Sequence, residues 1–126
     1  MKDLIVKPAI TINQAMKKLD ETAEKCLLIT DEKNHLLGTL TDGDIRRAIL
    51  CGALISSSIS GIYNKKPIIF NSDSFDKNHI KKIFLQNKID LIPIVNKKNN
   101  LVGYKTWDSV FGNGNRRKLK TLNVPH

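Results

Sequence analysis

The sequence contains one short pattern twice, and this repetition constrains the fold more than any other feature. The segments ITDEKNHLLGTLT (29–41) and IVNKKNNLVGYKT (94–106) share Ile, Lys, Asn, Leu, Gly and Thr at six of thirteen positions, at a constant offset of 65 residues. An amphipathic helix pattern precedes each copy, so the order of elements is duplicated too. A single copy would cover only one face of a sheet, and we therefore expect the two copies to pack against each other.

Each copy is predicted to run strand, helix, strand, turn, strand, helix. In the first copy we expect a short extended piece ending at 10–11, a helix from Thr11 or Asn13 to about Glu24, strands at 26–30 and 36–41, and a helix at 42–52 ended by Gly52. In the second copy we expect strands at 67–70, 90–95 and 101–106, and helices at 76–87 and 106–111. The serine-rich connection at 53–66 is expected to cross the surface between the copies.

Composition favours a single compact domain whose positive charge is interpreted as a solvated surface rather than as the mark of an anionic partner. No apolar run approaches the roughly 20 residues of a membrane-spanning helix, and the N-terminus has no export signal, so we expect a cytoplasmic protein without membrane association. The net charge of +9 is spread along the chain, apart from a cluster at Arg116, Arg117, Lys118 and Lys120 in the tail. Nucleic-acid binding is an alternative, but 6% aromatic residues provide no stacking platform.

The segment Thr41-Asp42-Gly43-Asp44 has several chemical interpretations. A calcium loop starting at Asp42 needs a Glu at its twelfth position, which is Ala53 here. The two aspartates form a D-x-D pair, which by itself is weak support for a metal site. Cys26 and Cys51 are expected to be buried as small apolar residues rather than to bind zinc or form a disulfide, and no nucleophile is arranged around the histidines. The sequence therefore predicts neither a catalytic residue nor a metal ion in this chain.

Two uses of this segment remain open from the residues themselves. Thr41 or Asp42 is a good N-cap, and Asp44 in the first helical turn gains from the helix dipole without any ligand. Alternatively, a hydroxyl and a carboxylate at a strand-to-helix junction can face a ligand whose phosphate lies at the helix N-terminus. Arg46 or Arg47 could then pair with the phosphate, and the helix pattern favours Arg47.

The patterns LLGTLTDGDI and LVGYKTWDSV, together with the LIPIV strand at 91–95, resemble a tandem pair of CBS domains, the module named after cystathionine β-synthase. The resemblance covers about residues 1–111. It implies an α+β fold of two β-α-β-β-α repeats about a pseudo-twofold axis, with repeat 1 at 1–58, repeat 2 at 59–112 and a basic linker or tail at 113–126. It also implies a regulatory module that binds AMP, ADP or ATP between the repeats and requires no cofactor.

The resemblance assigns roles to particular residues. Asp44 would accept bonds from the two ribose hydroxyls, and Thr41 would bond the phosphate or the backbone. The second repeat keeps Thr106 but has Ser109 in place of Asp44, so the two sites should be unequal. Apolar walls for the base would come from the strands and from the entry pieces before them. The residues expected there, unless they simply pack in the core, are Leu27, Leu28, Ile10, Ile68, Ile92 and Pro93. Because proline lacks a backbone donor, Pro93 is expected at an edge or irregular strand position, next to a cleft.

The wording GTLTDGDIRRAIL is also similar to CBS pairs that precede nucleotidyltransferase domains in bacterial sugar-nucleotide enzymes. On that basis we expect a catalytic domain, absent from this chain, to be covalently attached to it. CBS pairs form face-to-face dimers, so a homodimer through the helices is expected as well. A purely structural dimerisation domain without any ligand is the alternative function. The sequence identifies neither the nucleotide nor the attached domain.

Overall fold

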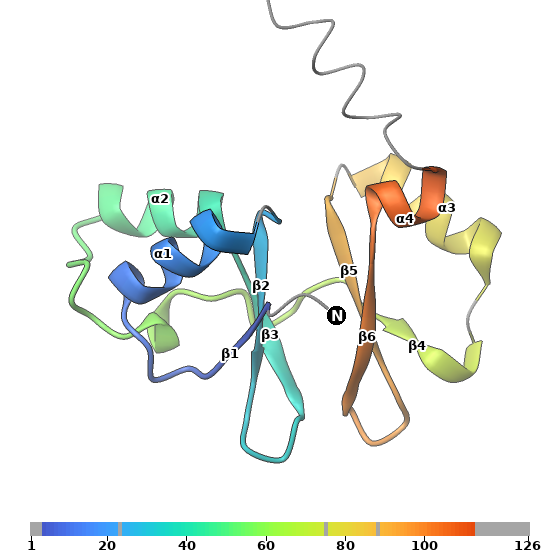
Figure 1. Ribbon diagram of the computed structural model, residues 1–126, viewed down its shortest axis with the longest axis horizontal. Coiled ribbons are helices and arrows are strands. Elements are labelled where there is room, and N and C mark those ends of the chain that lie inside the picture. Colours follow the sequence, from blue (N-terminus) through green and yellow to red (C-terminus); the bar gives the residue numbers. More distant parts are fainter. Residues whose placement is uncertain (1–3, 23, 75, 88, 113–126) are drawn as a thin grey trace, which may run out of the picture.

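The chain folds into two three-stranded sheets that face each other, with helices on the two outer sides (Figure 1). The structure, a computed structural model, describes residues 4–22, 24–74, 76–87 and 89–112. The first repeat contains β1 (Ile5–Val6), α1 (Ile12–Thr22), β2 (Cys26–Thr30), β3 (Leu36–Thr41) and α2 (Asp42–Leu50). The second contains β4 (Phe70–Asn71), α3 (Lys77–Asn87), β5 (Leu91–Val95), β6 (Leu101–Thr106) and α4 (Trp107–Phe111). The predicted α+β class and the duplicated β-α-β-β-α order are confirmed.

The strand directions and the antiparallel register are duplicated along with the element order, whereas the parallel register differs by one residue, with Ile5 opposite Leu28 but Phe70 opposite Ile94. In each sheet the first strand pairs parallel with the second, and the second pairs antiparallel with the third. Even the irregularity is repeated, because the register shifts between Ile29 and Thr30 in one sheet and between Ile94 and Val95 in the other. The sequence repeat thus reflects two copies of one structural unit.

The core has three parts, one under each helix pair and one between the sheets. Successive side chains of a strand point to opposite faces, so Leu27 and Ile29 pack under α1 and α2. Leu28 points the other way, into a cluster with Leu91 and Leu101 of the second repeat. The repeats therefore pack sheet against sheet, as the need to cover both faces of each sheet predicts.

The two hairpin loops bond to each other reciprocally. The Asn34 side-chain amide donates to the Leu101 carbonyl at 2.9 Å, and the Asn99 amide donates to the Leu36 carbonyl at 2.9 Å. Both asparagines have positive φ, 68° and 64°, a conformation that asparagine tolerates better than most residues. The backbone repeats the exchange, since Leu36 N–H donates to the Asn99 carbonyl and Leu101 N–H to the Asn34 carbonyl. This accounts for an asparagine at the same place in both copies.

Replacing Asn34 or Asn99 by alanine is expected to lower the free energy of unfolding by about 1–2 kcal/mol, through the lost hydrogen bond and the strained φ. Urea denaturation of the single variants measures this. Asn→Gly at the same positions is the matched control, because glycine accepts positive φ and loses only the side-chain bond. Unchanged stability in both alanine variants would show that the loops do not hold the repeats together.

Two of the predicted entry strands lie elsewhere or are shorter. β1 lies at Ile5–Val6 rather than at 10–11, and β4 starts only at Phe70. In the first repeat Leu28 N–H donates to the Leu4 carbonyl at 2.8 Å, but the position equivalent to Leu28 in β5 is Pro93, which has no N–H. The expectation that Pro93 marks an edge or irregular position holds locally, because a register shift follows at Ile94 and Val95. Pro93 lies in the central strand, but β4 pairs only with the two residues after it, Ile94 and Val95, so Pro93 has no strand partner on the β4 side.

The connection at 53–66 does more than cross the surface. Ile59, in the 3-10 turn Ile59–Gly61, is fully buried in the first core. Asn64 forms a two-way backbone bridge with Thr39 of β3, at 3.0 and 2.8 Å. A Cβ on Gly38 would collide with the Asn64 carbonyl and the Tyr63 ring, so only glycine allows this crossing. The segment therefore extends the first sheet beyond β3 at one position, through the backbone bonds of Asn64, and adds Ile59 to the core.

The two cysteines differ in environment. Cys26 is buried as predicted, but Cys51 is exposed because it follows the last turn of α2 as its C-cap. Gly52, next to it, has φ of +101° and ends the helix as the sequence predicted. The basic tail expected at 113–126 lies outside the described residues.

Candidate functional site

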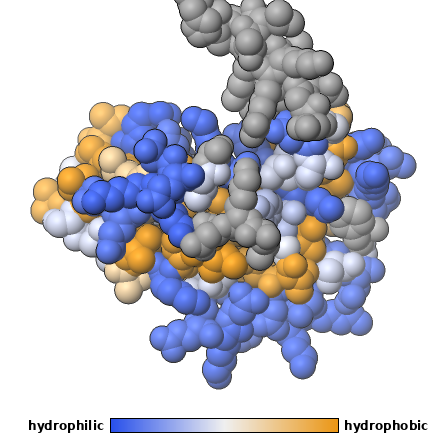
Figure 2. Space-filling view, viewed as in Figure 1, coloured by the Kyte–Doolittle hydropathy of each residue, from blue (hydrophilic) through white to orange (hydrophobic). Residues whose placement is uncertain are grey.

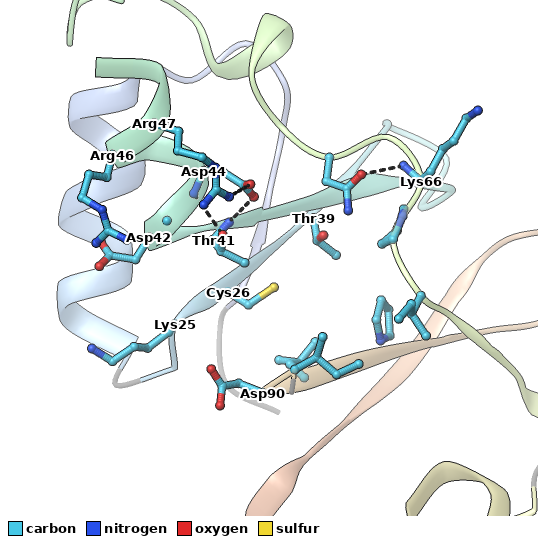
Figure 3. Close-up of a pocket in the computed structure, with 17 residues that line it drawn as sticks. Lys25, Cys26, Thr39, Thr41, Asp42, Asp44, Arg46, Arg47, Lys66 and Asp90 are labelled. Atoms are coloured by element: carbon cyan, nitrogen blue, oxygen red, sulfur yellow. Dashed lines mark hydrogen bonds and ion pairs between the residues drawn. The ribbon is translucent and has the colours of Figure 1, made fainter. Parts of the chain in front are cut away.

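A pocket of about 670 Å³ lies between the repeats, at the junction of β3 and α2 (Figure 3). Its first side is built by the start of β2, the end of β3 and the first turns of α2. Its second side is built by the connection before β4 and by the start of β5. The lining residues are Lys25, Cys26, Thr39, Thr41, Asp42, Gly43, Asp44, Arg46, Arg47, Asn64, Lys66, Pro67, Ile68, Ile89, Asp90, Leu91 and Pro93.

Thr41 and Asp44 form a reciprocal cap at the start of α2. The Thr41 hydroxyl accepts from the Asp44 N–H at 3.1 Å, and Asp44 Oδ2 accepts from the Thr41 N–H at 2.9 Å. Such a box satisfies two backbone donors that the helix would otherwise leave free. Capping, one of the two uses that the sequence left open, is therefore present and occupies one carboxylate oxygen.

The other oxygen of Asp44 is paired with Arg47. Arg47 Nη2 lies 2.8 Å from Asp44 Oδ1, and the Asp44 side chain is 19% exposed while that of Arg47 is 67% exposed. The guanidinium also lies over the first turn of α2, since a Cβ on Gly43 would be 3.2 Å from Arg47 Nη1. A solvent-exposed pair of this kind is weak and readily exchanged.

The pocket combines charge with an apolar wall. Its basic residues are Lys25, Arg46, Arg47 and Lys66, and its acidic ones are Asp42, Asp44 and Asp90. The apolar wall comes from Pro67, Ile68, Ile89, Leu91 and Pro93. A ligand that fits such a pocket has an anionic part, hydroxyl groups and a flat apolar part.

Cys26 lines the same pocket as a neutral thiol. Burial, helped by the negative charge of Asp44, raises the pKa of Cys26 to about 12. The thiolate is the nucleophilic form of cysteine, and at neutral pH this side chain is almost entirely protonated. Cys26 therefore contributes a small apolar surface to the pocket.

The residues that the sequence proposed for the site separate into two groups. Thr41, Asp44, Arg47 and Pro93 line the pocket. Leu27, Leu28 and Ile92 are fully buried, each in a different core cluster. Ile10 packs against the cluster under α1 and α2. Ile68, which the sequence also proposed for the apolar wall, lines the pocket, and so does Ile89, which it did not propose.

Sequence reasoning missed several charged lining residues. Lys25 and Asp90 lie immediately before β2 and β5, and Lys66 lies in the connection. The repeat offered a signal, because position 25 plus 65 is position 90, so the two strand-start residues are equivalent. The facing sheets bring them to the same pocket.

The second repeat has the same cap without the carboxylate. Ser109 N–H donates to the Thr106 hydroxyl at 3.2 Å, and Thr106 N–H donates to Ser109 Oγ at 2.9 Å. The one Ser109 hydroxyl proton is donated to the Thr106 carbonyl at 2.9 Å. Neither residue lines the pocket described above. Thr106 and Ser109 thus reproduce the helix cap of the first repeat but have no acidic group.

The described residues contain neither a group of three or more His, Cys, Asp and Glu side chains that could hold a metal ion, nor a helix that is long and apolar enough to cross a membrane.

Comparison with known proteins places this geometry in a known fold. Residues 1–51 match the family model of the CBS domain. The CBS-domain pair of protein MJ0100, solved with 5′-methylthioadenosine and S-adenosyl-L-methionine, superposes with a TM-score of 0.74 over 87% of this chain and 89% of that one, at 24% identity. The fold is that of a CBS-domain pair. CBSX2 in complex with AMP gives a TM-score of 0.73 at 20% identity, covering 94% of this chain and 89% of that one.

Curated relatives by sequence are much longer than this chain. An uncharacterized protein of Chlamydia muridarum is 29% identical over 90 residues, which are 70% of this chain and 27% of that protein. The arabinose 5-phosphate isomerase GutQ of Salmonella typhi is 26% identical over 95 residues, 75% of this chain and 29% of that protein. The chain therefore spans under a third of the length of these relatives.

Proposed function

We propose that this CBS pair is a regulatory module that binds an adenine nucleotide in the pocket between its repeats. The observation that carries the proposal is the pocket itself, where a carboxylate, four basic side chains and an apolar wall converge from both repeats. Neighbours of the same fold were solved with AMP and with ATP, which supports an adenine nucleotide as the ligand class.

The pocket chemistry divides between the parts of such a ligand. Asp44 Oδ1 accepts from the ribose hydroxyls, because Oδ2 is held by the Thr41 N–H. The phosphate lies toward Arg47 and the other basic side chains, where charge-assisted bonds are strongest. The base rests on the apolar wall that includes Ile68 and Pro93. Thr41 acts through the helix cap that positions Asp44.

Regulation follows from the place of the pocket. A ligand that contacts both repeats changes their packing and biases an attached domain by the usual coupling of about 1–3 kcal/mol. We propose that the attached domain acts on a sugar phosphate. The similarity of GTLTDGDIRRAIL to CBS pairs of nucleotidyltransferases and the relative GutQ, an isomerase of arabinose 5-phosphate, both point to that substrate class. The GutQ match favours the isomerase of the two.

Isothermal titration calorimetry with AMP, ATP, GTP and sugar nucleotides tests the proposal. We expect heat with an adenine nucleotide and a stoichiometry of one per chain, because the cap of the second repeat has no carboxylate. Absence of heat with every ligand, at protein concentrations that reveal millimolar binding, would refute the sensing role.

A second candidate function is dimerisation through the helices, and exposed apolar side chains favour it. Leu50 and Leu54 are 79% and 68% exposed, and Ile49, Ile55 and Met16 add to the same side of the first repeat. Figure 2 shows hydrophobic surface at this side, where α1 and α2 lie in Figure 1. Exposed apolar groups that gather in this way are typical of a protein interface.

Leu50→Glu is expected to convert a homodimer to a monomer, because a charge would be buried without a partner at the contact. Sedimentation velocity over a concentration series measures this. Val102→Glu, on strand β6 where Val102 is 53% exposed, is the matched control and should leave the dimer intact. A wild-type chain that sediments as a monomer at every concentration would rule out this interface.

A further inference from the structure

In the pocket, the carboxylate of Asp44 is paired with the guanidinium of Arg47 (Figure 3). Asp44 Oδ2 accepts from the Thr41 N–H at 2.9 Å, and this bond is lost only if the helix cap is broken. Asp44 Oδ1 is the oxygen available for a ligand, and Arg47 Nη2 lies 2.8 Å from it. Arg47 therefore already occupies one acceptor position of Oδ1 and competes with any ligand hydroxyl for this oxygen.

Arg47 is able to leave this position. Its side chain is 67% exposed, and its guanidinium lies over Gly43, which has no side chain that could hold it there. A guanidinium has five N–H donors in a fixed fork that matches phosphate as well as carboxylate. A phosphate in the pocket would offer Arg47 a new anion at the moment when the ligand hydroxyls replace it on Asp44.

We propose that Arg47 makes this pocket selective for phosphorylated nucleosides over neutral ones. The Arg47 guanidinium stays paired with Asp44 until a ligand phosphate binds the guanidinium instead and leaves Asp44 free for the ligand hydroxyls. The proposal rests on the proposed function and names a specificity-determining residue for it. A neutral nucleoside has to break the ion pair without replacing it, whereas a nucleotide exchanges one anionic partner of Arg47 for another. The free pocket thus discriminates against adenosine before any contact with the base is made.

The second repeat supports this reading of the pair. At the constant offset of 65, Asp44 corresponds to Ser109 and Arg47 corresponds to Gly112. Both members of the ion pair are replaced together, while the cap residue threonine is kept. The helix cap therefore does not need the arginine, and the first repeat carries Arg47 for a purpose other than capping.

The test is calorimetric titration of the wild-type chain and of Arg47→Gln with AMP and with adenosine. We expect the variant to bind adenosine up to about fivefold more tightly, since an exposed ion pair is removed. AMP should bind the variant about tenfold more weakly, since a charge-assisted bond to phosphate is lost. Opposite changes for the two ligands cannot arise from a damaged fold, which would weaken both.

Arg46→Gln is the matched control, because it removes a neighbouring positive charge that lines the same pocket. This variant should bind AMP more weakly than the wild-type chain and bind adenosine with unchanged affinity. Raising the salt concentration gives a further check without any variant, because screening of the exposed pair should strengthen adenosine binding and weaken AMP binding.

The inference is overturned if the wild-type chain binds AMP but Arg47→Gln changes the affinities for AMP and adenosine in the same direction, or changes neither affinity. That result would leave the nucleotide pocket intact and remove only the role of Arg47. If the wild-type chain binds neither ligand, the proposed function itself fails, and this inference fails with it.

Discussion

Asp44→Ser is expected to abolish adenine-nucleotide binding while the chain stays folded. The variant removes the carboxylate that accepts the ribose hydroxyls, and two bonds to a charged group at about 1.5–3 kcal/mol each correspond to a loss of at least about 100-fold in affinity. The second repeat shows that serine at this position keeps the reciprocal cap, because Ser109 bonds Thr106 as Asp44 bonds Thr41. Calorimetry with AMP measures the loss, and thermal unfolding shows that the fold persists.

Asp44→Ala is the matched comparison for that variant. Alanine removes the carboxylate and the half of the cap that accepts from the Thr41 N–H, so it should also lower stability by about 1 kcal/mol. Asp44→Ser should stay closer to the wild-type stability. Binding of AMP to Asp44→Ser with wild-type affinity would show that the carboxylate does not hold the ligand.

Gly38→Ala is expected to destabilise the chain by about 3 kcal/mol, the range of core changes that force the backbone to move. The new Cβ would meet the backbone carbonyl of Asn64 and lie 2.6 Å from the Tyr63 ring. The crossing segment would have to move, which breaks the two backbone bonds between Thr39 and Asn64. Nucleotide affinity should fall as well, because Asn64 and the residues after it line the pocket. Urea denaturation gives the stability change.

Gly103→Ala is the internal control, since Gly103 is the repeat counterpart of Gly38. No atom among the described residues lies within 4 Å of a Cβ at this position, and alanine in a strand is better by about 0.5–1 kcal/mol than glycine. The variant should be neutral or slightly more stable. Equal losses in the two variants would mean that the crossing segment is not the reason for Gly38.

The sequence predicted the repeated elements well because their signals are local. Capping residues, alternating strands and helix-ending glycines set the bounds of α2, β3 and β6 to within two residues. Thr41 and Asp44 were found for the same reason, since a cap and a strand end are adjacent in the chain. Their proposed role in ligand binding came from the resemblance to CBS pairs, which a local signal alone does not supply.

Leu27, Leu28 and Ile92 were proposed for the apolar wall but are buried in the core, because period-two alternation does not say which face of a buried strand meets a ligand. All five residues of β2 are buried, so Leu27 and Leu28 look alike in sequence although they face different cores. Lys66 and Asp90 reach the pocket only through the packing of one repeat on the other. The burial of Ile59 was not predicted either, because a single apolar residue in a serine-rich stretch gives no periodic signal.

Titration of the 15N-labelled chain with AMP, followed by amide chemical shifts, tests most directly whether a nucleotide binds between the repeats. We predict that Thr41 to Arg47 in the first repeat and Ile89 to Leu91 in the second shift together, with one dissociation constant and one ligand per chain. Shifts confined to one repeat, or shifts centred on Thr106 and Ser109, would contradict a ligand in this pocket.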